Sequence, residues 1–94
     1  MTIKILTPES LVFEGEVDSL LVPGVSGEFQ IFKNHAAVVS SLKNGEIRIF
    51  TSNMEGGFEK NFRQSPQRSN EYIYKIRSGV LEFNNNTGVL LCEE

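Results

Sequence analysis

Positions 27–36 of the chain read Gly27-Glu28-Phe29-Gln30-Ile31-Phe32-Lys33-Asn34-His35-Ala36. The Ser26-Gly27 pair is typical of a tight turn, and a short apolar run from Phe29 to Phe32 follows it. The only histidine, His35, comes just after this run. The segment therefore predicts a turn, a strand and then a loop.

The same short-strand pattern extends from this segment in both directions. Runs in which apolar residues dominate or alternate with polar ones occur at 2–6, 11–13, 17–22, 29–32, 35–42, 47–50, 72–76, 80–83 and 89–92. Turn residues separate these runs, and no segment offers a capped helix of ten or more residues. We therefore expect an all-β fold, an antiparallel β-sandwich or flattened barrel of about eight to ten short strands.

Two polar segments are candidate hairpin turns. Asn44-Gly45 is the stronger signal, because Asn-Gly readily supplies the positive φ angles of a type I′ turn. The second is the run 84–88, Asn-Asn-Asn-Thr-Gly. We expect a hairpin at each.

The composition changes between Phe50 and Tyr72. Residues 51–70 are mainly polar and contain Gly56-Gly57 and Pro66. Phe58 and Phe62 have the spacing of one helical turn, but we favour a long β-hairpin insertion at about 51–71, with 55–63 as one arm and 70–76 as the other. The whole chain, 1–94, is then one domain.

The bulk composition excludes several classes of function. The chain has 94 residues, 39% of them hydrophobic, and a net charge of -3, which does not favour nucleic-acid binding. The single Cys92 excludes an internal disulfide and is interpreted as an apolar residue at a strand end. The N-terminal residues predict a strand rather than a signal peptide, and no apolar run has the roughly 20 residues that span a bilayer.

The residues available do not support catalysis or a cofactor. The chain has one histidine, one cysteine and one aspartate, too few for a metal site with ordinary ligands, and no nucleophile motif frames Ser40 or Ser41. Glu14 and Glu16 are interpreted as a solvated strand face rather than an acid/base pair. No phosphate-binding loop follows the glycines. We expect no catalytic, metal-binding or nucleotide-binding residues and no cofactor.

Several motifs together resemble one family. They are Gly27-Glu28-Phe29-x-Ile31 with His35-Ala36, Leu42-x-x-Gly45 with Ile47-x-Ile49, Ile5-x-Thr7-Pro8-Glu9, Phe13-x-Gly15-x-Val17, and Ser78-Gly79-Val80-Leu81-Glu82-Phe83-x-Asn85-Asn86. In order and spacing they resemble the N-terminal β-sandwich of the F-type ATP synthase epsilon subunit, over the whole chain except about 51–70. The chain differs from the family's usual pattern at Gln30, Lys33 and Ala37.

The resemblance implies a non-catalytic rotor subunit in the central stalk. Such a subunit joins the gamma subunit to the membrane c ring, so that proton- or sodium-driven rotation is coupled to ATP synthesis. Residue by residue, it implies c-ring contacts at Glu28, Phe29 and His35, and gamma contacts at Thr7, His35, Val38 and Ser40. An apolar patch should meet gamma and a polar loop should meet the ring. A structural role for His35, with its ring nitrogens bonded to loop backbone, is the alternative.

The resemblance also sets expectations about context. Family members commonly continue into a helical hairpin that can block rotation, whereas this chain stops at Cys92-Glu93-Glu94, so inhibition by that device is not expected. We expect a protein that is monomeric when isolated and peripheral at the cytoplasmic face of the bacterial inner membrane, held there only through the complex. A freestanding β-sandwich binding module for a peptide or carbohydrate is the alternative.

Overall fold

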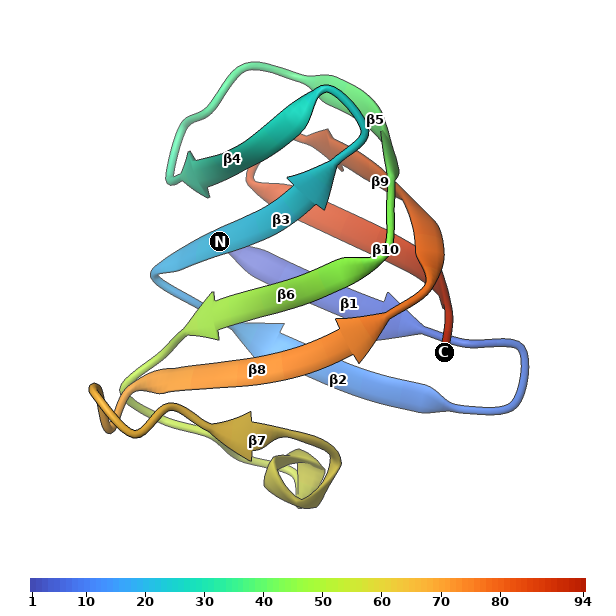
Figure 1. Ribbon diagram of the computed structural model, residues 1–94. Coiled ribbons are helices and arrows are strands. Elements are labelled where there is room, and N and C mark those ends of the chain that lie inside the picture. Colours follow the sequence, from blue (N-terminus) through green and yellow to red (C-terminus); the bar gives the residue numbers. More distant parts are fainter.

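The computed structural model describes residues 1–94 as ten strands and one short 3-10 helix (Figure 1). The elements are β1 (Thr2–Leu6), β2 (Leu11–Glu16), β3 (Ser19–Gly24), β4 (Gly27–Phe32), β5 (Val38–Leu42), β6 (Gly45–Phe50), η1 (Phe58–Asn61), β7 (Arg63–Gln64), β8 (Glu71–Ile76), β9 (Ser78–Asn84) and β10 (Thr87–Glu93). No helix is long and apolar enough to cross a bilayer.

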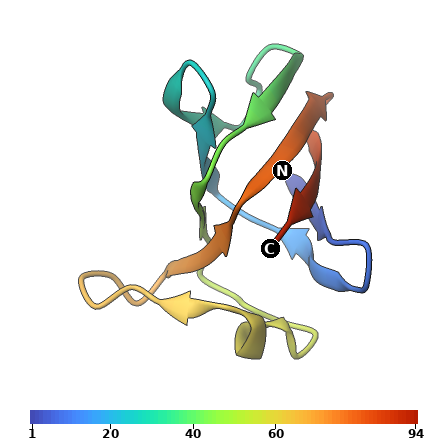
Figure 2. The same cartoon turned by 45° about the vertical axis from the view of Figure 1, so that its right-hand side comes forward.

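All ten strands belong to one sheet that folds over on itself. The strand order is β2-β1-β10-β9-β5-β3-β6-β8-β7, and β4 pairs with the other edge of β3. The fold-over lies between β5 and β3, where Gly24 and Leu42 form the one registered pair. Figure 2 shows the resulting layers, with β1, β9 and β10 in one, and β3 and β6 in the other.

Alternation along the strands builds the core between these layers. Inward-facing residues form one cluster of 17 buried side chains, and many of them, such as Ile5, Leu20 and Leu81, are fully buried. Successive strand residues point to opposite faces, so the period of two in the sequence becomes one buried and one exposed face. Cys92 is one of the 17, which confirms its interpretation as an apolar strand residue.

The expected all-β sandwich is confirmed, with one difference in strand direction. β1 and β10 pair in parallel, from Thr2↔Thr87 to Leu6↔Leu91, while every other pair is antiparallel. The parallel pair joins two strands from opposite ends of the sequence. Such a pairing leaves no local turn signal, which is why the sequence did not reveal it.

The expected hairpin at Asn44-Gly45 is wrong. β5 and β6 do not pair with each other: β5 pairs with β9, and β6 pairs with β3 and β8. Lys43-Asn44 instead forms the corner at which the chain passes between the layers. The expected hairpin at 84–88 is confirmed, because Asn85 and Asn86 have φ angles of 52° and 58° between the paired β9 and β10.

The long hairpin expected at 51–71 is wrong over most of its first arm. Residues 58–61 form η1, the helical turn that the phenylalanine spacing allowed, and only Arg63 and Gln64 pair with β8. Phe62 accounts for the helical turn in place of a strand arm. Its ring packs edge-on against Phe13 and Tyr72, with ring centroids 5.9 and 6.3 Å away.

The η1 segment also covers the exposed edge of β2. The Asn61 side-chain amide donates to the carbonyl of Val12 at 2.9 Å, and Phe58 packs against Phe13 with ring centroids 5.8 Å apart. An uncovered strand edge exposes unpaired backbone groups to other chains. The segment therefore closes the open side of the sandwich.

Ion pairs link β6 to β7 and β8 beside this segment. Arg48 donates to Glu71 and to Glu46, both at 2.7 Å, and Arg63 donates to Glu46 at 2.8 Å. Glu71 is 6% exposed, and the hydrogen bond from Arg48 lowers the pKa of its carboxyl group, against the opposing effect of burial. Paired in this way, the charge is tolerated at a buried position.

Replacement of Phe62 by alanine should lower the free energy of unfolding by about 2–4 kcal/mol, because a largely covered aromatic ring is lost from the β2–β8 contact. Phe32→Ala is the matched control: Phe32 is 57% exposed, and its loss should cost well under about 1 kcal/mol. Urea denaturation monitored by circular dichroism measures both. Equal costs for the two variants would contradict the closing role of Phe62.

Replacement of Glu71 by glutamine should remove stability that depends on pH. Because the pKa of folded Glu71 is lowered, its ionised form stabilises the fold above the unfolded pKa of about 4.3, and this contribution disappears as the pH falls through the folded value. The wild-type advantage over Glu71→Gln should thus be largest near neutral pH and vanish in acid. Glu82→Gln, at an exposed and unpaired carboxylate, is the control. An advantage that does not change with pH would contradict this role.

Candidate protein-docking surface

β4 is the edge strand from which the candidate surface is built. It pairs with β3 alone, from Gly24↔Gly27 to Ser19↔Phe32. The opposite residue of Glu28 is Pro23, whose carbonyl accepts the Lys43 amide at 2.9 Å on the far side of β3. In an antiparallel ladder, the two residues of a pair either hydrogen-bond to each other or both direct their N–H and C=O groups away from each other. Because the Pro23 carbonyl bonds to Lys43, the N–H and C=O groups of Glu28 point to the free edge of β4.

The turn that starts β4 depends on glycine. Gly27 has a φ of 133°, which other residues rarely adopt, and a side chain there would meet nothing within 4 Å. Gly24 has the opposite constraint: a Cβ would lie 2.7 Å from the carbonyl oxygen of Gly27. The turn is therefore tight, and it fixes the direction in which Glu28 leaves the sheet.

The loop after β4 carries His35 in a defined orientation. The ring Nδ1 lies 2.7 Å from the carbonyl oxygen of Ala36, and the ring packs edge-on to Phe83 at 6.1 Å between centroids. Because a carbonyl only accepts, Nδ1 carries the proton of the neutral ring and Nε2 is an acceptor. His35 is exposed, and its Nδ1 has the backbone bond that a structural role requires.

The structure separates the residues predicted to meet the c ring. Glu28 and Phe29 lie at the start of β4, and His35 lies beyond its end. A strand of six residues is about 17–20 Å long, so Glu28 and His35 are not one cluster. Glu28 is exposed, whereas Phe29 is half-buried and packs against the core.

The residues predicted to meet gamma are also spread out. Val38 and Ser40 lie on β5 opposite Phe83 and Leu81, so both are directed toward the inside and are half-buried. Thr7 lies in the β1–β2 turn, where its hydroxyl accepts the Ser10 amide at 3.2 Å. Three strand steps, from β1 through β10 and β9 to β5, separate Thr7 from Ser40.

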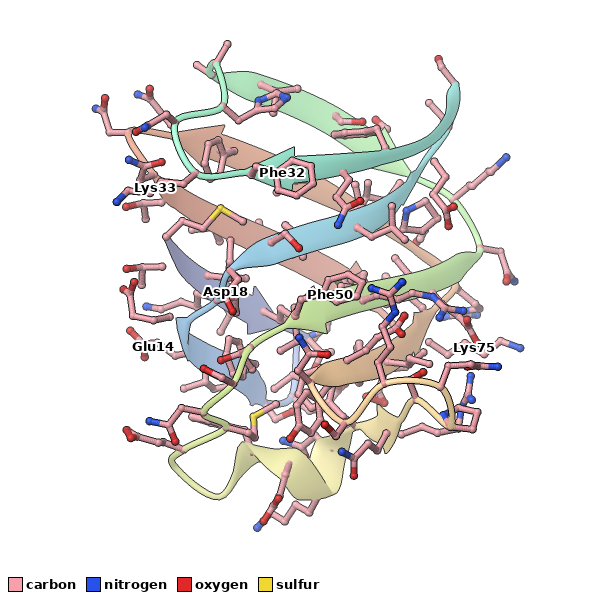
Figure 3. All side chains as sticks on the ribbon, turned by 90° about the vertical axis from the view of Figure 1, so that its left-hand side faces the viewer. Glu14, Asp18, Phe32, Lys33, Phe50 and Lys75 are labelled. Atoms are coloured by element: carbon pink, nitrogen blue, oxygen red, sulfur yellow. The ribbon has the colours of Figure 1, made fainter.

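Sequence reasoning missed the exposed apolar residues beside these positions. At the β4–β5 end, they are Val25, Phe32 and Val39, which are 56%, 57% and 71% exposed. Figure 3 shows Phe32 on β4 and Phe50 on β6, on either side of β3. On the outer face of the other layer, Leu91 lies between Val80 and Leu6 in register. The strand alternation could have identified Phe32, since it places Ile31 inside and its neighbour outside.

A polar groove of about 990 Å³ lies at the end of the sandwich that is on the left in Figure 3. Glu14, Asp18 and Lys33 are among its lining residues. Glu14 pairs with Lys4 at 3.9 Å and is half exposed, and a hydrogen bond from Thr2 lowers the pKa of Glu16. Both glutamates are therefore solvated, ion-paired groups on one strand face.

The groups of this surface suit contact rather than reaction. No group of three or more His, Cys, Asp or Glu side chains is placed to hold a metal ion. The exposed features are an edge strand, an oriented loop and separate apolar side chains. Such features provide backbone hydrogen bonds and apolar contact area to another protein.

Comparison with known proteins identifies the family. Residues 1–63 match the family described as the beta-sandwich domain of the ATP synthase Delta/Epsilon chain. The chain belongs to this family. The ATP synthase epsilon chain of Chlorobaculum tepidum is 33% identical over 93 residues, covering 99% of this chain and 89% of that protein. That of Campylobacter jejuni is 52% identical over 46 residues, covering 49% of this chain and 36% of that protein.

Two solved structures that share this fold are chains of mitochondrial ATP synthases. A chain of the Euglena gracilis OSCP/F1/c-ring structure matches 98% of this chain with a TM-score of 0.74 and 14% identity. A chain of the Tetrahymena thermophila central stalk/c-ring structure matches 99% with a TM-score of 0.69 and 13% identity. This chain spans 49% and 63% of those chains, and the likeness shows the shared fold.

Replacement of Gly27 by alanine should destabilise the fold by about 1–3 kcal/mol through backbone strain alone, because the side chain itself would have open space. Ser26→Ala, in the same exposed turn, should be near neutral. Thermal unfolding of both variants measures the difference. A Gly27→Ala variant as stable as Ser26→Ala would show that the turn does not require this backbone conformation.

Proposed function

We propose that this protein is a non-catalytic rotor subunit in the central stalk of an F-type ATP synthase. It joins the gamma subunit to the membrane c ring and couples proton- or sodium-driven rotation to ATP synthesis. The observation that carries the proposal is the 33% identity to the Chlorobaculum tepidum ATP synthase epsilon chain, which extends over 99% of this chain and 89% of that protein. A match of this extent includes both layers of the sandwich.

The β4 end meets the c ring in this proposal. Glu28 is exposed at the start of β4, and His35 is exposed in the loop beyond its end. Phe29 supports the strand from inside, because it is half-buried against the core. The proposed ring contacts are thus polar groups near the two ends of β4, Glu28 at its start and His35 in the loop beyond its end.

The gamma subunit is contacted by the layer that contains β1, β9 and β10 and by its β5 edge. On that layer's outer face, Leu91 is 56% exposed and Val80 is 43% exposed. Leu6 lies beside Leu91 in register, and Thr7 follows Leu6 in the sequence. Val38 and Ser40, which are half-buried and directed inward, support this edge from β5, and the exposed His35 in the adjoining loop extends it. Apolar side chains of this kind provide the desolvated centre of a protein interface.

The same surfaces argue against the binding-module alternative. A pocket for a free peptide or carbohydrate would gather exposed aromatic rings, whereas Phe32 is the one aromatic residue among the exposed large apolar residues here. The domain transmits force because its strands are paired across a folded sheet. In the assembled complex it is peripheral, at the cytoplasmic face of a bacterial inner membrane, and the isolated chain is a monomer.

Replacement of Glu28 by lysine should weaken coupling, because it reverses the charge presented to the ring while leaving a fully exposed side chain. We expect ATP-driven ion pumping by membranes carrying the variant to fall severalfold at unchanged ATP hydrolysis. Glu59→Lys on η1 is the control, with the same charge change at an exposed site on the opposite side of the sandwich. Unchanged pumping by Glu28→Lys, with the variant folded and assembled, would contradict the ring contact.

A further inference from the structure

The loop that carries His35 is tied to a distant turn by two asparagines. The backbone N–H of Asn34 donates to the side-chain oxygen of Asn86 at 2.6 Å, and the side-chain amide of Asn86 donates to the side-chain oxygen of Asn34 at 3.0 Å. The two residues are 52 positions apart in the sequence. We refer to this reciprocal pair, Asn34 with Asn86, as the asparagine clasp.

The local backbone explains why asparagine suits both positions. Asn34 has a φ of 70° and Asn86 a φ of 58°, in the left-handed region that asparagine tolerates better than most residues with a side chain. Glycine would satisfy the backbone at either position but could not form the clasp. A side-chain amide supplies both a donor and an acceptor, so Asn86 can bond to Asn34 twice.

The clasp is the loop's hydrogen-bonded link to the rest of the fold. Among residues 33–37, the other hydrogen bonds are local: His35 N–H to the Phe32 carbonyl at 3.1 Å, and the His35 ring to Ala36. The one further anchor is the contact of the His35 ring with Phe83, which belongs to the same β9–β10 hairpin as Asn86. The β9–β10 turn thus orients a loop that follows β4.

We propose that Asn34 and Asn86 are positioning residues, which hold the His35 loop in the conformation that docks on the rotor. This inference rests on the proposed function. A loop that is ordered before contact loses less conformational entropy on binding. The apparent affinity of the protein for its partner is proportional to the fraction of molecules whose loop has the binding conformation. The clasp acts before docking and makes no contact with the partner itself.

Three glycine variants of the full-length protein test the clasp without adding backbone strain. Asn86→Gly removes both hydrogen bonds, whereas Asn34→Gly removes only the side-chain one. Asn85→Gly is the matched control, because Asn85 has a φ of 52° in the same turn and its side chain makes no hydrogen bond. All three substitutions lie in exposed or half-exposed turns, so the fold should persist in each.

Two measurements report separately on the order of the loop and on its binding to the partner. Amide exchange followed by NMR should show the Asn34 N–H exchanging roughly threefold to tenfold faster in Asn86→Gly than in Asn85→Gly, the range expected for the loss of one or two hydrogen bonds. Affinity for an immobilised complex of the gamma subunit and c ring should fall by a similar factor. The double variant of Asn34 and Asn86 should bind no more weakly than Asn86→Gly alone, because the shared interaction is already lost.

The outcomes distinguish the two proposals, with Glu28→Lys measured in the same binding assay. If Glu28→Lys weakens binding and Asn86→Gly behaves as Asn85→Gly in both measurements, the clasp has no positioning role. Faster exchange without weaker binding in Asn86→Gly also overturns it, since the loop would then be ordered by the partner. If the wild-type protein does not bind the complex at all, the proposed function fails first.

Discussion

The close approach of two backbone segments at one corner determines how the ten-stranded sheet folds over. Gly24 pairs with Leu42, and hydrogen bonds on each side of this pair join Val25 to Ser41 and Lys43 to Pro23, at 3.0 and 2.9 Å. A Cβ on Gly45 would lie 2.8 Å from the Pro23 side chain. Residues without a side chain are therefore required where β3 crosses from β6 to β5.

This corner also leaves β4 as an edge strand. Because β5 pairs with β9 and reaches β3 at the single pair Gly24↔Leu42, the remaining edge of β3 is occupied by β4, whose outer edge stays free. The edge along β2 is covered by η1 through Asn61 and Phe58, and the two-residue β7 forms the other end of the strand order. The six-residue β4 is thus the long uncovered edge strand, whereas β2 is protected from unintended strand pairing.

Most of the strands could be predicted from the sequence, but the arrangement of the candidate surface residues could not. Strands such as 72–76 and 89–92 were predictable because the alternation of apolar and polar residues is a local pattern. The Asn85-Asn86 turn was predictable because the preference of asparagine for positive φ angles is also local. The Asn44-Gly45 corner and η1 were not, since their outcome depends on Pro23 and Phe13, which are distant in sequence. The positions of Glu28, His35 and Thr7 on the chain could be predicted, but their separation could not, because it depends on strand order. Asn34 and Asn86 carried no signal beyond a tolerance for turns.

Isolation of the native partners of this domain tests most directly whether it is part of the rotor. The tagged full-length protein would be expressed in its host, the membranes solubilised gently, and the retained proteins quantified by mass spectrometry. The account predicts recovery of the gamma subunit, the c subunit and the catalytic subunits in the proportions of one assembled synthase. Recovery of the tagged protein alone, from membranes whose synthase is intact and contains another epsilon subunit, would contradict it.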